Sequence, residues 1–207
     1  MESAVQLEPR LSRSDRGAMW VLMAAGAAIA VTTAVFAGIR IAEVLGNHDV
    51  EVLGEFAGTL AQAPIGPDGA AVEVELDRAV LTVPSLPVAA VGALVLQQLA
   101  LVATIWTLVA TLCLVTLSAM RGRTFSRRNT RLVGAAGIVG VLGFAAVPFF
   151  GNMGANAAFA QLSDYTFDNV IMSVDLFPLV LGAFVAALAG TVFAVGDRLR
   201  REAEGLV

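Results

Sequence analysis

Four long apolar runs constrain the fold of this chain more than any other feature of its sequence. They cover about 18–39, 88–120, 132–150 and 171–195. Asp175 is the one ionised side chain within them. A helix that rises 1.5 Å per residue needs about 20 apolar residues to cross a bilayer core about 30 Å thick. The sequence therefore predicts an all-α polytopic membrane protein, a bundle of four transmembrane helices in a single membrane domain that covers residues 1–207.

Composition excludes most soluble classes of protein. Apolar residues make up 57% of the chain and charged residues 14%, whereas a typical soluble domain is about a quarter charged. Too few charged side chains remain to coat four such helices in water. A net charge of -4 with this apolar content also excludes a disordered chain. Cys113 is the single cysteine and His48 the single histidine, so neither a disulfide scaffold nor a metal or other cofactor is expected.

All 13 basic residues are arginine, and their positions predict how the spans face. Cytoplasmic loops of membrane proteins carry an excess of basic residues. Arginines gather before the first run, between the second and third, and after the fourth: Arg10, Arg13, Arg16, Arg121, Arg123, Arg127, Arg128, Arg131, Arg198, Arg200 and Arg201. The connection of about 46–87 is rich in Asp and Glu and holds Arg78 as its one basic residue. Both termini and residues 121–131 are therefore predicted to be cytoplasmic.

A cleaved export signal is the alternative interpretation of the first run. A basic leader precedes this run, and Val35–Ala37 is typical of a cleavage site. However, the run exceeds the roughly 7–15 residues of a signal core. Its removal would also leave the cytoplasmic arginines on the wrong side, so an uncleaved first span is favoured.

The connection of about 46–87 is long enough to fold outside the lipid. Apolar residues at helical spacing predict a short amphipathic helix in its first part: Val52, Leu53, Phe56 and Leu60. After a turn at Gly66–Gly69, Val72–Leu76 alternates between apolar and acidic residues as a half-buried strand does. Asp77–Arg78 is predicted to turn this strand into a second one at Ala79–Val83. A lone hairpin is marginal in water, so we expect a small extracytoplasmic helix/β-hairpin cap that lies against the spans.

The predicted cytoplasmic loop is short and strongly basic. Its arginines are Arg121, Arg123, Arg127, Arg128 and Arg131. Either Ser126 or Asn129 is expected to cap the third helix. The arginines have two interpretations: they set the topology alone, or they also bind anionic lipid or a regulatory protein partner. Each basic charge near an anionic membrane surface contributes about 1 kcal/mol of binding.

Small residues indicate how the helices pack. They recur every four positions in the first and fourth runs: Gly26, Ala30, Ala34 and Gly38, then Gly182, Ala186, Gly190 and Ala194. This spacing lets helix backbones approach closely in lipid. It predicts that the two helices touch or that one stripe mediates dimerisation. Pro148 is expected to kink or end the third helix, and Trp106, in the middle of the second run, is expected to face another helix.

Polar side chains near the predicted outer ends of the spans are the candidates for a ligand site. They are Arg40, Glu43, Gln97, Gln98, Asn152, Asn156 and Asp175. Together they can form a polar vestibule beneath the cap that binds a small ligand or ion. The alternative is that they satisfy helix ends and anchor the cap, with Arg40 and Glu43 paired one turn apart. No carboxylate falls near the middle of a run, so a proton or sodium relay is not supported.

Two short motifs resemble a known family. Gly122–Asn129 (GRTFSRRN) resembles the inner-loop signature, and Phe193–Glu202 (FAVGDRLRRE) resembles the ending, of the bacterial four-span membrane family catalogued as domain-of-unknown-function family 2975. Thr124 stands where that family is expected to have proline. The resemblance implies a four-helix protein of the bacterial cytoplasmic (inner) membrane and hints at a regulatory partner. It implies no reaction, substrate or catalytic residue.

These features favour a non-enzymatic membrane protein that serves as an accessory or regulatory subunit and binds a protein partner and membrane lipid. The alternative is a component of a small-solute or ion transporter or channel. That alternative requires a homo-oligomer, because four helices leave little room for a private pore. The sequence contains no Gly-rich phosphate loop, nucleophile motif or acid–base constellation. Neither an enzymatic activity nor a nucleic-acid partner is therefore expected.

Overall fold

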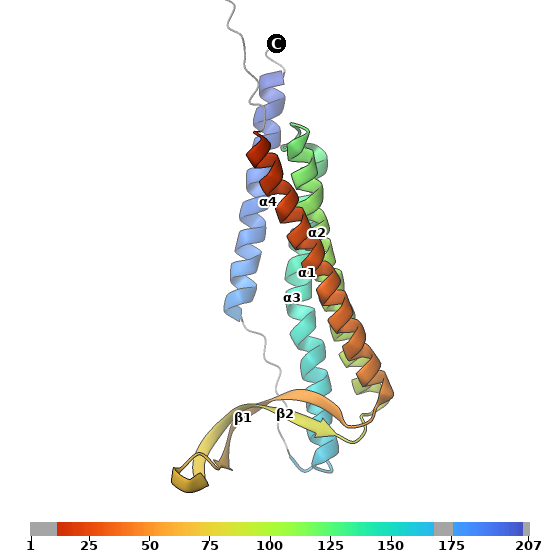
Figure 1. Cartoon of the computed structure of the whole chain (residues 1–207), viewed down its shortest axis with the longest axis vertical. Coiled ribbons are helices and arrows are strands. Elements are labelled where there is room, and N and C mark those ends of the chain that lie inside the picture. The colour runs from red at the N-terminus through yellow and green to blue at the C-terminus, as the bar shows by residue number, and fades with distance from the viewer. Residues whose placement is uncertain (1–11, 168–175, 205–207) are drawn as a thin grey trace, which may run out of the picture. The chain divides into compact units, whose positions relative to one another are not determined.

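The computed structural model describes residues 12–167 and 176–204, which form four α-helices, one short 3₁₀ helix (η1, Pro67–Gly69) and one two-stranded sheet (Figure 1). The helices are α1 (Arg13–Gly46), α2 (Val88–Met120), α3 (Arg127–Leu162) and α4 (Leu176–Glu204), and the strands are β1 (Val50–Ala63) and β2 (Val72–Val83). Each helix is long and apolar enough to cross a membrane. The prediction of a mostly helical chain with four such helices is confirmed.

The chain folds as two compact units, and every helix contributes residues to both. The first, which we call the hairpin unit, comprises the described residues of 34–103 and 141–181. The second, which we call the loop unit, comprises those of 12–33, 104–140 and 182–204. Both strands belong to the hairpin unit, whereas the connection between α2 and α3 belongs to the loop unit.

Serine side chains cap the first turns of α1 and α3. Ser12 Oγ accepts a hydrogen bond from the backbone N–H of Asp15 at 3.0 Å, and Asp15 Oδ2 accepts one from the N–H of Ser12 at 3.0 Å. This reciprocal pair satisfies two N–H groups that a helix start leaves free. At α3, Ser126 Oγ accepts from the N–H of Asn129 at 3.3 Å. Ser126 is therefore the cap among the two predicted candidates.

The two strands form one long antiparallel hairpin. Its root pairs residues 50–55 with 78–83, and its tip pairs residues 59–63 with 72–76. Between root and tip the ladder is interrupted, because three residues of β1 stand opposite Asp77 of β2. The interruption is a β-bulge, which separates the hairpin into two short ladders.

Two predictions for this segment are wrong. The helix predicted over 52–60 is part of β1, because burial alternates with a period of two: Val52 is 3% exposed and Leu53 is 58% exposed. The turn predicted at Asp77–Arg78 does not exist, and β2 continues through it. The turn predicted at Gly66–Gly69 closes the hairpin instead, because its Pro–Asp–Gly sequence supplies the positive φ that the reversal needs.

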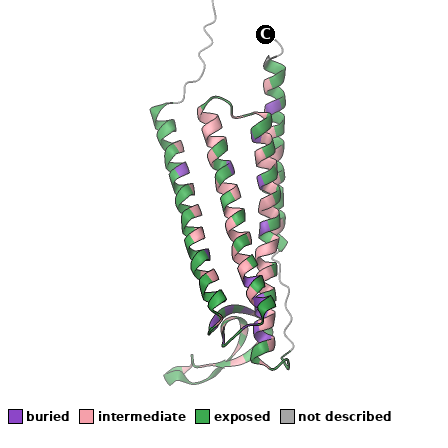
Figure 2. Cartoon of the chain, turned by 90° about the vertical axis from the view of Figure 1, so that its right-hand side faces the viewer, coloured by how far each residue is buried: buried purple, intermediate pink, exposed green. Residues whose placement is uncertain are grey.

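The core of the hairpin unit lies where the hairpin root meets the helices (Figure 2). Its buried members, none more than 5% exposed, are Val44, Val50, Val52, Val83, Leu86, Ala90, Leu94, Ala155 and Ala158. They come from α1, both strands, the segment after β2, α2 and α3. Burial of an aliphatic side chain of this size contributes about 1.5–3 kcal/mol. The root is therefore fixed to the helices by its own side chains.

Helix α3 runs through Pro148 and ends at Leu162. Pro148 therefore does not end the helix, contrary to one of the two outcomes predicted for it. The missing N–H of proline removes one hydrogen bond from the helix, a loss that membrane helices tolerate. The continuation beyond Pro148 supplies Ala155 and Ala158 to the core of the hairpin unit.

Candidate functional site

Arg40 of α1 connects its helix to the start of β1. One guanidinium nitrogen forms an ion pair with Glu43 Oε2 at 3.1 Å, as the spacing predicts, and the other donates a hydrogen bond to the carbonyl of Glu51. The Arg40 side chain is 29% exposed. Both ends of its guanidinium are therefore engaged within the protein, and its contacts are those of an anchor for the hairpin.

Four further residues of the predicted vestibule lie on the parts of α2 and α3 in the hairpin unit. Gln97, Gln98, Asn152 and Asn156 are all half-buried. The Gln97 side chain lies so close to the Cα of Gly151 that an added Cβ would fall 3.3 Å from its Cδ. Both asparagines have interaction partners. Asp175 lies outside the described residues, and the role of the set in ligand binding stays a prediction.

Asn47 clamps the two ends of the hairpin together. Its Nδ2 donates to the carbonyl of Leu86 at 3.0 Å, and its Oδ1 accepts from the N–H of Leu86 at 2.7 Å. Asn47 has a φ of 49°, a conformation that asparagine adopts more readily than most residues. This clamp was not predicted from the sequence. The local signal is limited to an asparagine directly after Gly46.

Three aromatic side chains hold the middle of the hairpin against the end of α3. The ring centroids of Phe56 and Phe159 lie 4.9 Å apart, and those of Phe159 and Phe167 lie 5.6 Å apart. Gly54 lets this cluster form, because a Cβ there would lie 2.8 Å from the Phe159 ring. Beyond the cluster the hairpin tip presents exposed apolar side chains, with Leu60 64% and Ile65 69% exposed.

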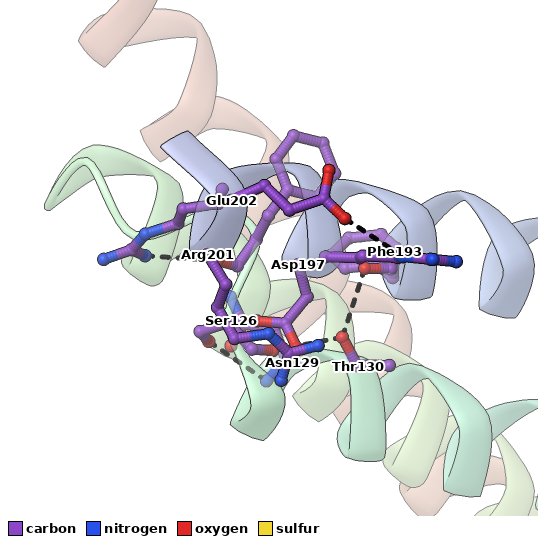
Figure 3. Close-up of polar contacts among 10 residues, drawn as sticks. Ser126, Asn129, Thr130, Phe193, Asp197, Arg201 and Glu202 are labelled. Carbon is purple, nitrogen blue, oxygen red and sulfur yellow. Dashed lines mark hydrogen bonds and ion pairs between the residues drawn. The ribbon is translucent and has the colours of Figure 1, made fainter. Parts of the chain in front are cut away.

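In the loop unit, the connection between α2 and α3 folds around Asn129 (Figure 3). The Asn129 side chain is 2% exposed, and its Nδ2 donates to the carbonyls of Arg123 at 3.1 Å and Thr124 at 2.8 Å. Ser118 Oγ donates to the same Arg123 carbonyl at 2.7 Å. The backbone of the connection is therefore fixed by side chains on both flanking helices.

This connection also contacts α4. The rings of Phe125 and Phe193 lie 5.6 Å apart, and a Cβ at Gly196 would fall 2.7 Å from Phe125 Cγ. Arg200 Nη1 donates to the Phe125 carbonyl at 3.1 Å. Phe125 thus fits against a helix surface that only glycine leaves open. The two motifs that carried the family resemblance pack against each other.

Thr130 and Asp197 add polar contacts at the same place (Figure 3). Thr130 Oγ1 donates to the Phe193 carbonyl at 3.3 Å. Asp197 is 8% exposed and forms an ion pair with Arg201 at 3.3 Å. All five arginines of residues 121–131 are exposed: Arg121, Arg123, Arg127, Arg128 and Arg131.

The small-residue stripes make contacts inside the loop unit. A Cβ at Gly26 of α1 would lie 3.2 Å from Val109 of α2. The Ala30 carbonyl accepts a hydrogen bond from Trp106 Nε1 at 2.9 Å, so Trp106 faces another helix as predicted. On α4, Ala186 packs against Gly137 of α3. The predicted contact between the two striped helices, or dimerisation through one stripe, stays a prediction.

Stripe members Gly38, Gly182 and Gly190 have no atom within 4 Å of an added Cβ.

Within residues 12–167 and 176–204, no group of three or more His, Cys, Asp or Glu side chains gathers to hold a metal ion. No protein-family model, curated protein or solved structure matches this chain. Function must therefore be inferred from the hairpin and the basic connection themselves.

Proposed function

We propose that this protein crosses a bacterial inner membrane four times and acts as a non-enzymatic accessory or regulatory subunit. Its hairpin binds a protein partner on the outer side, and both termini lie in the cytoplasm. The observation that carries the proposal is the contrast within the hairpin. The root is buried against the helices, with Val50 and Val52 each 3% exposed, whereas the tip is uncovered.

The apolar surface of the helices supports membrane insertion. At most 11% of the most apolar window of each helix is buried, and none of that of α4. Large apolar side chains on the helices are exposed, for example Val21 (70%), Phe36 (67%) and Phe184 (63%). An aliphatic or aromatic side chain left in water forgoes about 1.5–3 kcal/mol relative to burial. Lipid contact removes that penalty along all four helices.

Reporter fusions test the orientation. A reporter that is active only in the cytoplasm is expected to work at either terminus, and one that is active only after export is expected to work within Pro67–Gly69. The reason is that arginines gather near both termini and in residues 121–131, and basic residues favour the cytoplasmic side. The reverse pattern, or an exported signal at either terminus, contradicts the proposed topology.

The hairpin tip has the surface of a partner-binding element. The described residues form a sheet of two strands, so each strand of the tip has an outer edge without a ladder partner in that sheet. Such edges accept a further strand from another protein. Leu60 shares one face of the tip with Glu73 and Glu75. A partner segment with apolar and basic side chains complements this surface.

A pair of matched variants tests partner binding. The double variant Leu60→Asp, Ile65→Asp changes the tip, whereas Leu53→Asp, Val80→Asp changes exposed apolar side chains of the root, which are 58% and 61% exposed. Each variant is purified in mild detergent, and partner binding is followed by native mass measurement. The tip variant is expected to bind the partner at least about tenfold more weakly, since two interface side chains typically contribute more than about 1 kcal/mol each. The root variant is expected to retain it. Equal retention by both variants contradicts the proposed role of the tip.

The alternative function is a transporter or channel component that acts as a homo-oligomer. One observation favours self-association: no atom lies within 4 Å of a Cβ added at Gly182 or Gly190 of α4, and no residue in the apolar window of this helix is buried. Small residues at such a spacing bring membrane helices into close contact. A symmetric oligomer of this chain alone in the same native mass measurement supports this alternative over the accessory subunit.

A further inference from the structure

The arginines of α4 and those of residues 121–131 differ in their ion pairs. On α4, Arg198 pairs with Glu202 at 3.2 Å, and Arg201 pairs with Asp197 at 3.3 Å. Among residues 121–131, by contrast, no ion pair within the described parts of the chain involves any of the five arginines, which are Arg121, Arg123, Arg127, Arg128 and Arg131. We call these five residues the arginine loop. Among residues 12–167 and 176–204, no acidic side chain pairs with its charge.

Part of this charge lies where a helix least favours it. Arg127 and Arg128 occupy the first turn of α3, which contains no acidic residue. The N-terminal end of a helix carries a partial positive charge, so cations there are unfavourable. Arg131 lies three and four residues further on, at the spacings where like charges repel each other on a helix. An anion from outside the chain relieves all of these interactions.

The arginine loop is held in a defined shape. Asn129 and Ser118 bind the carbonyl of Arg123, and Asn129 also binds the carbonyl of Thr124. Arg200 binds the next carbonyl, that of Phe125. Three successive backbone acceptors are thus satisfied from within the protein, while the arginine side chains on the same segment stay exposed. A loop that only marks topology has no need of this internal scaffold.

We propose that the arginine loop is a binding site for the phosphate group of an anionic phospholipid in the inner leaflet. The loop begins directly after Met120, the last residue of apolar helix α2, so its side chains reach the level of the headgroups. Guanidinium groups bind phosphate oxygens through paired hydrogen bonds, and the cytoplasmic leaflet is rich in anionic lipid. The proposal rests on the proposed membrane insertion. Reporter fusions test insertion without reference to lipid, so an inserted chain that does not bind lipid overturns this proposal alone.

Lipid titration of the purified full chain in mild detergent tests the site. Phosphatidylglycerol is added in steps, phosphatidylcholine serves as the neutral lipid, and native mass spectrometry counts the bound molecules. We expect phosphatidylglycerol to bind at least about 30-fold more tightly, which corresponds to two arginine contacts. Inorganic phosphate distinguishes the source of the anion: it is expected to compete weakly, and tight binding of inorganic phosphate without preference for the lipid overturns the assignment.

Matched variants separate the site from general charge. Arg127→Gln, Arg128→Gln removes two charges from the arginine loop, and Arg13→Gln, Arg16→Gln removes two from the start of α1. The first is expected to weaken phosphatidylglycerol binding by about 30-fold, and the second by less than about threefold. Equal losses in the two variants overturn the proposal.

Two further variants keep every arginine and loosen the loop. Asn129→Ala removes the donor to Arg123 and Thr124, and the milder Ser118→Ala removes one bond to Arg123. Asn129→Ala is expected to reduce lipid affinity by about tenfold and Ser118→Ala by about threefold, because the arginines lose their fixed arrangement. If Asn129→Ala does not fold, as shown by its elution profile, Ser118→Ala gives the answer. Unchanged affinity in a folded variant overturns the proposal.

Discussion

Asn47→Ala is expected to lower the free energy of unfolding by about 3–5 kcal/mol. The substitution removes both hydrogen bonds to the backbone of Leu86, a residue that is only 4% exposed. An unpaired buried N–H or C=O costs about 1–3 kcal/mol, and an alanine at a φ of 49° adds about 1–2 kcal/mol. Reversible unfolding in detergent measures the change. Proteolysis within the hairpin turn is expected to speed up in parallel, because the clamp closes the base of the hairpin.

Two neighbouring substitutions separate these contributions. Asn47→Gly loses the hydrogen bonds but adopts positive φ freely, so its destabilisation is expected to be smaller by about 1 kcal/mol. Asn47→Asp keeps the acceptor for the Leu86 N–H and loses the donor to the Leu86 carbonyl. It is expected to fall between the wild type and alanine. A change below about 0.5 kcal/mol for Asn47→Ala, the range of an ordinary surface substitution, contradicts the clamp.

Gly154→Val is expected to destabilise the protein by about 3 kcal/mol through overpacking. Gly154 is buried on α3, and a Cβ there would lie 2.7 Å from Leu94 Cγ on α2. Leu94 is itself 5% exposed, so it has no free space to enter. The same measurement of unfolding in detergent gives the magnitude.

Two controls show whether the contact with Leu94 is the cause. Gly134→Val on the same helix places its side chain in open space and is expected to change stability by less than about 0.5 kcal/mol. The double variant Gly154→Val, Leu94→Ala is expected to lose about 0.5–3 kcal/mol less free energy of unfolding than the two single variants lose together. Strict additivity of the two substitutions rules out the clash as the source of the loss.

The helices could be predicted because lipid-spanning segments are defined by local composition. The run 88–120 coincides with α2 (Val88–Met120). The run 132–150 underestimates α3, which begins at Arg127 and ends at Leu162. Hydropathy identifies apolar residues, whereas a helix continues as long as its backbone hydrogen bonds are satisfied. The polar residues Asn152 and Asn156 extend α3 without extending the apolar run.

The hairpin could be predicted only in part, because its first strand has two apolar periodicities. Val52, Leu53 and Phe56 fit a helix, and Val50, Val52 and Gly54 fit a strand. The core of the hairpin unit decides between them, since burial of the second set requires α3, which is distant in sequence. Local spacing alone carries no information about that partner.

The sequence predicts which residues belong to the candidate sites, but it does not predict their contacts with residues distant in the chain. Arg40 and Glu43 pair at a spacing that sequence displays. Asn47 meets Leu86 39 residues away, and Phe125 meets Gly196 on another helix. Neither the length of the hairpin nor the fit of an aromatic ring against a glycine is encoded in a short motif. The arginines of residues 121–131 were visible from charge, but the scaffold around Asn129 that organises them was not.

The β-bulge between the root and tip of the hairpin makes the tip a separate ladder. Five ladder pairs hold the tip together by themselves, and the residues opposite Asp77 belong to neither ladder. Gly58, at a φ of 73°, lies in this gap. The ladder of the tip is therefore formed independently of the ladder of the root. A protein that binds the tip, as proposed above, would therefore contact a ladder that is separate from the root, the part of the hairpin packed against the helices.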